Sequence, residues 1–281
     1  MDVYLAIGAT VFGAIIGSFL NALSFRWGTG HSVLRGRSRC MQCGHTLGWR
    51  DLFPIFSYLY LRGRCRYCRS RISVQYPLVE AVAALISIVV YLQNPLSLFA
   101  YAFWLMVWMT LLFVAVYDLR HTVIPWACTI ALAVLALLYL ALHFGFGGAP
   151  GLAQVNDGLT KSIIWALLAG PLLALPLFLF SLISRGTWMG WGDGALELSL
   201  GWFLGLAYGA SALMIAFWSG AFVGVLLILL SKLTPTASSR GRAQRFTIKS
   251  EIPFAPFLVL GAFIVYALHL NFFITLPLLW Q

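Results

Sequence analysis

The chain has 281 residues, of which 61% are hydrophobic and only 9% are charged, and its mean hydropathy is +0.91. Soluble domains carry about 25% charged residues, so this composition excludes an ordinary soluble domain and predicts a polytopic membrane protein. The formal charge of +10 follows the membrane topology described below, so it does not predict nucleic acid as a partner.

Eight apolar segments are expected to cross the membrane as helices, because about 20 apolar residues match a hydrocarbon core roughly 30 Å thick. They span approximately residues 3–25, 76–92, 96–117, 124–145, 162–184, 195–208, 210–231 and 254–278. The sixth and seventh result from dividing the uninterrupted run 195–231 near Tyr208 and Gly209. The first shows no small-residue cleavage site and is expected to be retained. The predicted fold class is therefore all-α and polytopic.

The longest polar segment, residues 26–75, follows the first of these helices. It contains two CxxC pairs separated by 21 residues: Cys40, Cys43, Cys65 and Cys68. This spacing predicts a zinc-ribbon-like site in which four thiolates bind a structural zinc ion. A loop of about fifty residues buries little apolar surface, so the metal would supply its folding energy. Disulfide pairing is the alternative, disfavoured in a reducing compartment, and His45 is a second candidate ligand.

Two isolated carboxylates mark the ends of apolar segments further along the chain, which has only eight acidic residues. Asp118 closes the run 96–117 and opens the segment DLRHTVIP, and Asp193 ends the turn Gly190-Trp191-Gly192-Asp193. Burying a carboxylate in a bilayer costs roughly 2.5–3.5 kcal/mol, so an acid within a membrane segment is expected to be functional. Two such acids predict one shared site, in which mutual repulsion leaves a single proton for the pair.

The basic residues indicate the direction of the spans. With the N-terminus outside, the internal segments contain 17 of the 18 Lys and Arg residues; these segments are 26–75, 118–123, 185–194 and 232–253. Only Lys161 falls outside. The positive-inside rule therefore favours eight spans, with Asp118 and Asp193 on the same, cytoplasmic, side. Anionic membrane lipids are the expected counter-charge.

Six motifs, in this order along the chain, resemble those of the type IV prepilin peptidases. They are Gly17-Ser18-Phe19-Leu20-Asn21, the paired CxxC loop, Tyr76-Pro77-Leu78-Val79-Glu80, DLRHTVIP, the GWGD turn and Ile252-Pro253-Phe254-Ala255-Pro256-Phe257. The resemblance covers residues 13–261 and implies an aspartic endopeptidase of the GxGD type in the bacterial inner membrane. Its catalytic pair would be Asp118 and Asp193.

The same resemblance implies the substrates and a second activity. Enzymes of this family remove the short basic leader from prepilins of type IV pili, or from pilin-like subunits of type II secretion systems, at the cytoplasmic face. Many also N-methylate the new N-terminus, which requires S-adenosylmethionine. The chain has no Gly-rich nucleotide-binding fingerprint, so this cofactor is implied by the resemblance alone. The implied organisation is a helix over 1–25, a zinc-binding loop over 26–75 and a transmembrane catalytic domain over 76–281.

The residue types suit this chemistry. An ionised carboxylate takes a proton from the attacking water while its protonated partner donates to the scissile carbonyl oxygen. Gly190 and Gly192 lack Cβ atoms and would let the backbone approach a substrate strand or a neighbouring helix closely. The alternative for the two acids is a structural one, in which they pair with Arg120 or Arg185 or cap a helix.

One position departs from the family pattern. A lysine commonly stands two residues after the second aspartate, and here that position is Ala195. Glu197, on the same helical face as Asp193, is expected either to modulate the pair or to form an interhelical hydrogen bond. Glu80 is expected to pair with arginines of the loop, or to help bind the substrate's amino end.

Two other function classes stay open from the sequence. A cation or proton transporter would also use paired acids, but such acids are expected nearer the membrane midplane. A catalytically degenerate scaffold relative has the replacement at Ala195 as its only support.

Overall fold

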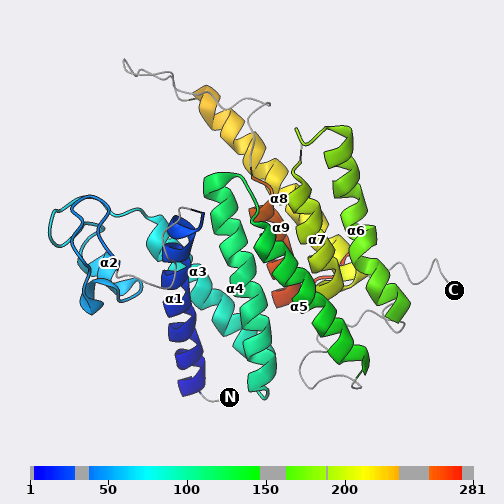
Figure 1. The fold of residues 1–281 in the computed structure, drawn as a ribbon, viewed down its shortest axis with the longest axis horizontal. Helices are drawn as coiled ribbons and strands as arrows, with labels where there is room; N and C mark the ends of the chain where they lie inside the picture. Colours follow the sequence, from blue (N-terminus) through cyan, green and yellow to red (C-terminus); the bar gives the residue numbers. More distant parts are fainter. Residues whose placement is uncertain (1–2, 29–37, 146–162, 188, 234–252, 274–281) are drawn as a thin grey trace. The chain divides into compact units, whose positions relative to one another are not determined.

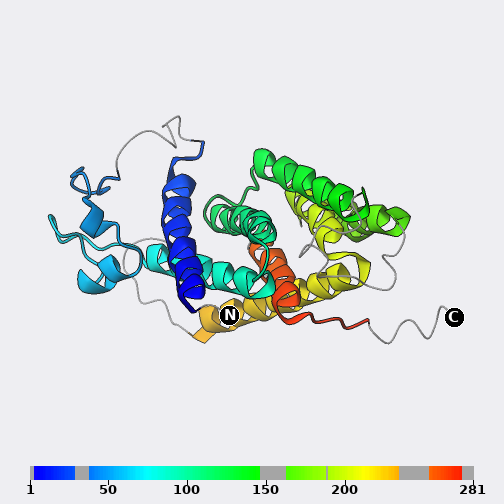
Figure 2. The ribbon, with the colours of Figure 1, turned by 90° about the horizontal axis from the view of Figure 1, so that it is seen from below.

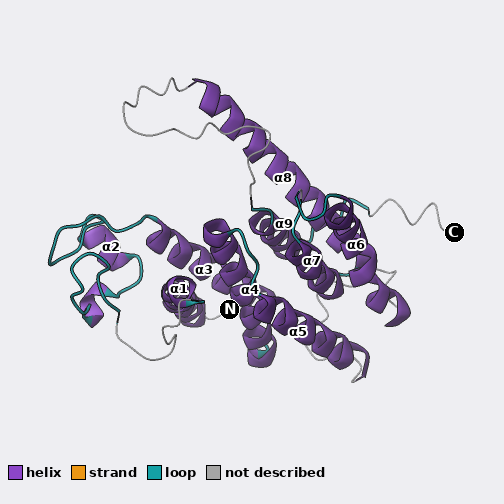
Figure 3. Ribbon diagram, turned by 45° about the horizontal axis from the view of Figure 1, so that its top comes forward, coloured by secondary structure: helices purple, strands orange, loops and turns teal. Residues whose placement is uncertain are grey.

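The computed structural model describes residues 3–28, 38–145, 163–187, 189–233 and 253–273, and all regular elements in these ranges are helices (Figures 1 and 3). In chain order they are α1 (Val3–Arg26), η1 (Trp49–Asp51), α2 (Phe56–Tyr60), α3 (Gln75–Gln93), α4 (Leu98–His121), α5 (Trp126–Gly145), α6 (Ile163–Ile183), α7 (Trp191–Leu204), α8 (Leu206–Leu233) and α9 (Ala255–Leu268). The expected all-α polytopic fold is confirmed.

Six of the eight expected spans are long and apolar enough to cross a membrane: α1, α3, α4, α5, α6 and α8. Helices α7 and α9 have 14 residues each, which corresponds to about 21 Å. That is shorter than a hydrocarbon core of roughly 30 Å. Within the described residues, these two helices are therefore too short to span it.

The expected division of residues 195–231 into two helices is confirmed, but its expected position near Tyr208 and Gly209 was wrong. The break lies at Gly205, which has φ 78° and ψ 175°, a backbone conformation that costs glycine little and other residues much. Gly209 lies inside α8 instead, where an added Cβ would collide with the Leu173 side chain of α6. The sequence contains two glycines close together, and only the packing shows that one breaks the helix while the other permits a close contact.

The chain divides into two compact units, residues 1–116 and 117–281. In the first unit, α1 crosses and packs against α3 (Figure 2). An added Cβ at Gly17 would lie 2.7 Å from Ala83 Cβ and 2.9 Å from Glu80 Cα, so this crossing requires a glycine. The Ser87 hydroxyl donates to the Ala9 carbonyl at 2.6 Å, which ties the same two helices together further along.

In the second unit, α7 packs between α5 and α6, and α9 packs on α8 (Figure 2). At Gly201 an added Cβ would lie 2.8 Å from the Cα of Gly170, so α6 and α7 meet backbone to backbone. The Trp202 indole donates to the Leu167 carbonyl at 2.9 Å and fixes the register of this pair. These contacts hold the C-terminal half of α7 against α6, and the candidate site begins at the opposite, N-terminal, end of the same helix.

Candidate functional site

Asp118 lies in the last turn of α4 and is only 4% exposed. The helix ends just after it, because Thr122 has a left-handed φ of 51° and Pro125 cannot continue a helix. The backbone N–H of Ala255, the first residue of α9, donates toward the Asp118 carboxylate. The positive end of a helix dipole therefore lies against this carboxylate.

Asp193 lies in the first turn of α7 and is 7% exposed. Its Oδ2 accepts a hydrogen bond from the Gly190 N–H at 3.2 Å, and the Asp193 N–H donates to the Gly190 carbonyl at 3.3 Å. This reciprocal arrangement is a capping box without the usual hydroxyl. It fixes the carboxylate at the point where α7 begins.

The glycines of this turn have different roles. A Cβ at Gly192 would lie 2.9 Å from Ile124 Cβ, in the segment that follows Asp118. A Cβ at Gly194 would lie 2.7 Å from the Phe178 ring of α6. At Gly190 the nearest atom would be 3.6 Å away, an ordinary contact. The close approach expected of the GWGD glycines thus occurs at Gly192, against the neighbouring chain segment.

The two aspartates line one pocket of about 340 Å³, and the negative charges of their carboxylates repel each other. The remaining lining residues are Thr122, Val123, Ile124, Trp126, Gly186, Thr187, Met189, Gly190, Trp191, Gly192, Pro253 and Phe254. Pro253 and Phe254 belong to a motif recognised in the sequence, but Trp126 and Met189 carried no signal except their closeness to the acidic motifs. Two carboxylates beside an aromatic and aliphatic wall can perform acid–base chemistry on a bound, partly apolar chain.

Glu197 lies one turn beyond Asp193 and is 1% exposed. Its Oε1 has no hydrogen-bond partner among the described residues. Leaving a buried polar atom without a partner costs free energy, so the residue is unfavourable for stability where it stands. Ala195, at the position of the family lysine, is partly exposed and supplies no charge.

Glu80 belongs to the first unit and has a different environment. It is 6% exposed, and its Oε2 accepts a hydrogen bond of 2.7 Å from the backbone N–H of Ile55. The Ser18 side chain also interacts with this carboxylate. In the structure Glu80 therefore connects the polar loop to α1 and α3.

The four cysteines of the polar loop converge. Their Sγ atoms all lie within 4.8 Å of one another, and Cys40 and Cys68 are 3.8 Å apart. Zinc–sulfur bonds of about 2.3 Å in a tetrahedron place the sulfur atoms about 3.8 Å apart. The four cysteines of the cluster are free thiols in the structure, and their separations fit a tetrahedral metal site.

Two matching knuckles build this cluster. The Cys40 N–H donates to the His45 carbonyl and the Gly44 N–H to the Cys40 carbonyl, both at 2.9 Å. The equivalent bonds 25 positions later run from Cys65 to Ser70 at 2.8 Å and from Arg69 to Cys65 at 3.0 Å. Gly44 and Arg69 both have positive φ, 68° and 60°. The same local turn occurs twice, and His45 serves it through its backbone carbonyl.

The thiols show why a cation is needed. Backbone N–H groups of Cys43 and Gln42 lower the pKa of Cys40 to about 6, and Ser70 lowers the pKa of Cys68. The backbone of His45 favours the Cys43 thiolate too, but desolvation and the thiols of Cys40 and Cys68 raise the pKa of Cys43 to about 11. Four thiolates this close together repel one another, and a bound divalent metal ion would offset their charge.

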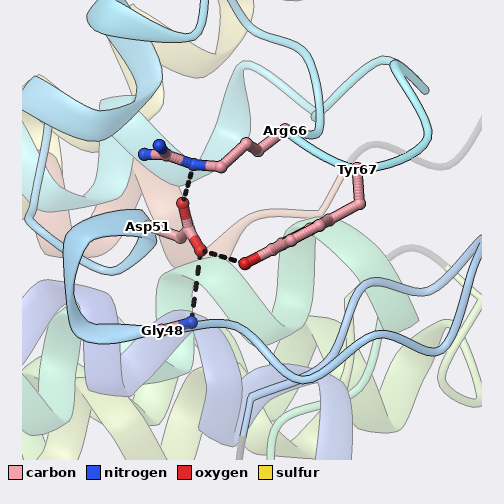
Figure 4. A network of polar contacts seen from close by, with 4 residues as sticks. All are labelled: Gly48, Asp51, Arg66 and Tyr67. Carbon is pink, nitrogen blue, oxygen red and sulfur yellow. Dashed lines mark hydrogen bonds and ion pairs between the residues drawn. The ribbon is translucent and has the colours of Figure 1, made fainter.

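Asp51 joins the turn at Gly48 to Arg66 and Tyr67 of the second knuckle (Figure 4). Its carboxylate accepts hydrogen bonds from Arg66 Nε at 2.7 Å, the Gly48 N–H at 3.2 Å and the Tyr67 hydroxyl at 3.4 Å. Tyr67 also packs on the His45 ring, with centroids 3.7 Å apart. Sequence reasoning assigned Asp51 no such role, although its being the only acid among ten arginines in residues 26–75 is a signal for it.

Comparison with known proteins agrees with these features. Residues 11–94 match the family model described as Bacterial Peptidase A24 N-terminal domain. A Prepilin leader peptidase/N-methyltransferase from Pseudomonas putida is 32% identical over 91% of this chain and 88% of its own length. Proteins of the same name from Aeromonas hydrophila (32%, 83% and 72%) and Burkholderia pseudomallei strain 1026b (31%, 90% and 82%) are also similar.

No solved structure matches the chain significantly. The similarity to the Pseudomonas putida relative extends over nearly the whole of both chains. The resemblance found in the motifs is confirmed, and the chain belongs to the prepilin leader peptidase/N-methyltransferase family.

Proposed function

We propose that this protein is a membrane aspartic endopeptidase that removes the basic leader from type IV prepilins or pilin-like secretion subunits. The observation that carries the proposal is the burial of Asp118 and Asp193 in one pocket, with their charges in repulsion. Two like charges held together in a low-dielectric site share one proton. That is the protonation state an aspartic protease needs.

The reaction would use both members of this pair. The ionised carboxylate takes a proton from a water molecule, whose oxygen attacks the scissile carbonyl carbon, while the protonated partner donates to the carbonyl oxygen. The resulting gem-diol collapses, the C–N bond breaks, and the nitrogen of the leaving chain takes up a proton from the pair. The N–H groups of Ala255 and Gly190 hold the two carboxylates in position throughout.

We place the reaction at the cytoplasmic face of the bacterial inner membrane. The six membrane-spanning helices support the membrane location, and the concentration of 17 of 18 Lys and Arg residues in segments on one side supports the orientation. Asp118 and Asp193 lie within two of these segments, 118–123 and 185–194. The client's apolar helix would then reach the pocket from the bilayer while its leader stays in the cytosol.

Zinc is the metal we propose for Cys40, Cys43, Cys65 and Cys68, because four thiolates in a tetrahedral arrangement are typical of a closed structural zinc site. When bound, zinc supplies the charge that the four thiolates need and fixes the loop. Gly190, Gly192, Glu80 and Glu197 are assigned supporting roles, Gly192 through its contact with Ile124 and Glu80 through Ile55.

N-methylation of the new N-terminus is a second proposed activity. It rests on the printed name of the relatives, Prepilin leader peptidase/N-methyltransferase. S-adenosylmethionine would supply the methyl group. We assign no described residue to this cofactor.

The decisive experiment incubates the purified protein in liposomes with a panel of prepilins, beside the Asp118→Asn and Asp193→Asn variants. Leader removal is read by mass spectrometry, and a product heavier by about 14 Da indicates methyl transfer. Cleavage by the wild type alone supports the proposal. Cleavage that persists in either variant contradicts the aspartic mechanism.

Absence of cleavage by a well-folded wild type would turn attention to Ala195. Cleavage restored by Ala195→Lys would then identify a degenerate peptidase. A proton or cation flux into the same liposomes, lost in both Asn variants, would instead identify a transporter.

A further inference from the structure

A patch of large exposed side chains covers the segment around η1 and α2. Five of them are Trp49, Phe53, Phe56, Leu59 and Tyr60, with exposed fractions of 73%, 52%, 67%, 64% and 80%. Three exposed arginines, Arg50, Arg62 and Arg64, stand beside them. We call this set the aromatic–arginine surface. Exposed apolar side chains gathered within a dozen residues mark an interaction site.

A hydrogen bond joins this surface to the beginning of α3, one of the helices long enough to cross a membrane. The Ile55 N–H, directly before α2, donates to Glu80 Oε2 at 2.7 Å. Glu80 is the sixth residue of α3, which has 19 residues, so α3 is about 28 Å long and Glu80 lies about 7.5 Å along it. A helix of that length has little to spare beyond the hydrocarbon core. The start of α2 is therefore bound to the second turn of a helix long and apolar enough to cross a membrane.

The backbone at this junction is held in a strained conformation. Ile55 has φ 62° and ψ −52°, and the Phe56 N–H donates to the Pro54 carbonyl at 2.6 Å. This is a γ-turn of the rare type, which is costly for a β-branched residue. The turn directs the Ile55 N–H to the buried Glu80 carboxylate. The aromatic–arginine surface is thus held at the membrane boundary by a specific contact.

The composition of the surface indicates its partner. Aromatic rings are enriched at the level of lipid headgroups, where arginines extend toward phosphate. Residues 26–75 carry ten arginines and one acid, Asp51, and Asp51 is already paired with Arg66 at 2.7 Å. A basic peptide such as a prepilin leader would be repelled, whereas anionic phospholipid is attracted.

We propose that the aromatic–arginine surface inserts its rings into the headgroup layer of the surrounding membrane and binds anionic phospholipid through Arg50, Arg62 and Arg64. The cysteine cluster is then held next to the bilayer. The loop is attached to the membrane at its two ends, through α1 and α3, and between them through the aromatic–arginine surface. This inference rests on the membrane-spanning helices and the loop geometry, and it is independent of the proposed peptidase activity.

Photocrosslinking in the full-length protein tests the contact. Phe56 is replaced by the photoreactive p-benzoylphenylalanine, and Met41, which is 77% exposed on the first cysteine knuckle, is replaced in the same way as a control. The proteins are placed in nanodiscs of phosphatidylcholine with phosphatidylglycerol, or of phosphatidylcholine alone, and crosslinked peptides are identified by mass spectrometry. Bound metal is measured in each variant, and position 60 replaces position 56 if metal is lost.

In the mixed nanodiscs, the yield of lipid-linked peptide is expected to be several-fold higher from position 56 than from position 41. The yield from position 56 is expected to decrease several-fold in nanodiscs of phosphatidylcholine alone. Adding Arg62→Gln and Arg64→Gln to the Phe56 variant should produce the same decrease without changing lipid composition. Equal lipid labelling at positions 56 and 41, or labelling indifferent to phosphatidylglycerol, overturns the proposal. Crosslinking in native membranes to a prepilin or another protein in place of lipid also overturns it.

Discussion

The cysteine cluster and the aspartate pair bring polar groups together in opposite ways. Each half of the cluster is a four-residue knuckle closed by its own backbone hydrogen bonds, and Cys43 and Cys68 are exposed. The aspartates stand 75 positions apart, at the end of one helix and the start of another, and both are buried. Local turns suffice in the polar loop, but in the apolar region only helix ends provide free backbone donors.

This contrast implies that the two sites fail independently. The cluster lies in the first compact unit and the pair in the second. Loss of one is therefore expected to leave the internal geometry of the other intact.

The largest expected effect is at the pair. Asp118→Asn or Asp193→Asn should lower prepilin cleavage by on the order of 10²–10⁴-fold or more, because an amide cannot exchange the shared proton. Bound metal, measured on the same samples by elemental mass spectrometry, should stay at the wild-type level. Metal loss in these variants would show that the two sites are coupled.

Removing the cluster should give the reverse pattern. Cys40→Ser combined with Cys65→Ser should reduce bound zinc from about one equivalent to near zero, because one ligand is lost from each knuckle. Cleavage should fall less than in the Asn variants. Cys128→Ser, in α5 and outside the cluster, is the control and should retain the metal; zinc retained by the double variant would contradict the assigned ligands.

Gly192→Ala tests a contact between two segments that are remote in the sequence. The new Cβ would lie 2.9 Å from Ile124 Cβ, which costs about 1–3 kcal/mol and displaces Asp193 from Asp118. Cleavage should fall about tenfold or more, and Gly190→Ala, with its nearest contact at 3.6 Å, should have a smaller effect. Gly8→Ala, with no atom within 4 Å, controls for the change of residue type; a Gly192 variant as active as this control would show that the close approach is dispensable.

Glu197→Leu should raise stability while lowering activity. It removes a fully buried carboxyl that has one oxygen without a described partner, so thermal unfolding in detergent should show a gain of about 1–3 kcal/mol. Cleavage should fall several-fold if this carboxyl supports the pair one turn away, and Glu197→Gln should lie between. Loss of both stability and activity would instead identify Glu197 as a structural hydrogen-bond partner.

The smallest effect is expected at Asp51. Although desolvation opposes it, the hydrogen bond from Arg66 holds the pKa of Asp51 below its ordinary value of 3.8. The folded loop therefore gains stability from this carboxylate above pH 3.8, and the gain is lost as the pH falls below that value. Asp51→Asn should weaken zinc retention by less than about tenfold at pH 7. It should also reduce the decrease in the loop's melting temperature as the pH is lowered through 3.8. A decrease of the wild-type size in the variant would show that other groups control the acid sensitivity.

The sequence alone determined the features that depend on neighbouring residues. Hydropathy located the helices because crossing a bilayer requires a continuous apolar run, and the CxxC spacing located the metal site because each knuckle is a single local turn. The isolated acids Asp118 and Asp193 stood out for the same reason, since each is anomalous in its own segment. Their convergence in one pocket is a property of the folded unit.

Tertiary structure decided the rest, because one pattern permits several packings. Gly205 and Gly209 look alike in sequence, and only the contact with Leu173 separates the helix break from the packing site. The carboxylate of Asp51 accepts a hydrogen bond from Arg66, and that of Glu80 accepts one from the Ile55 N–H. No periodicity in the sequence predicts either pairing. Such pairings depend on the distance between segments remote in the chain, and the free energy of a buried polar group is set by whether that distance permits a hydrogen bond.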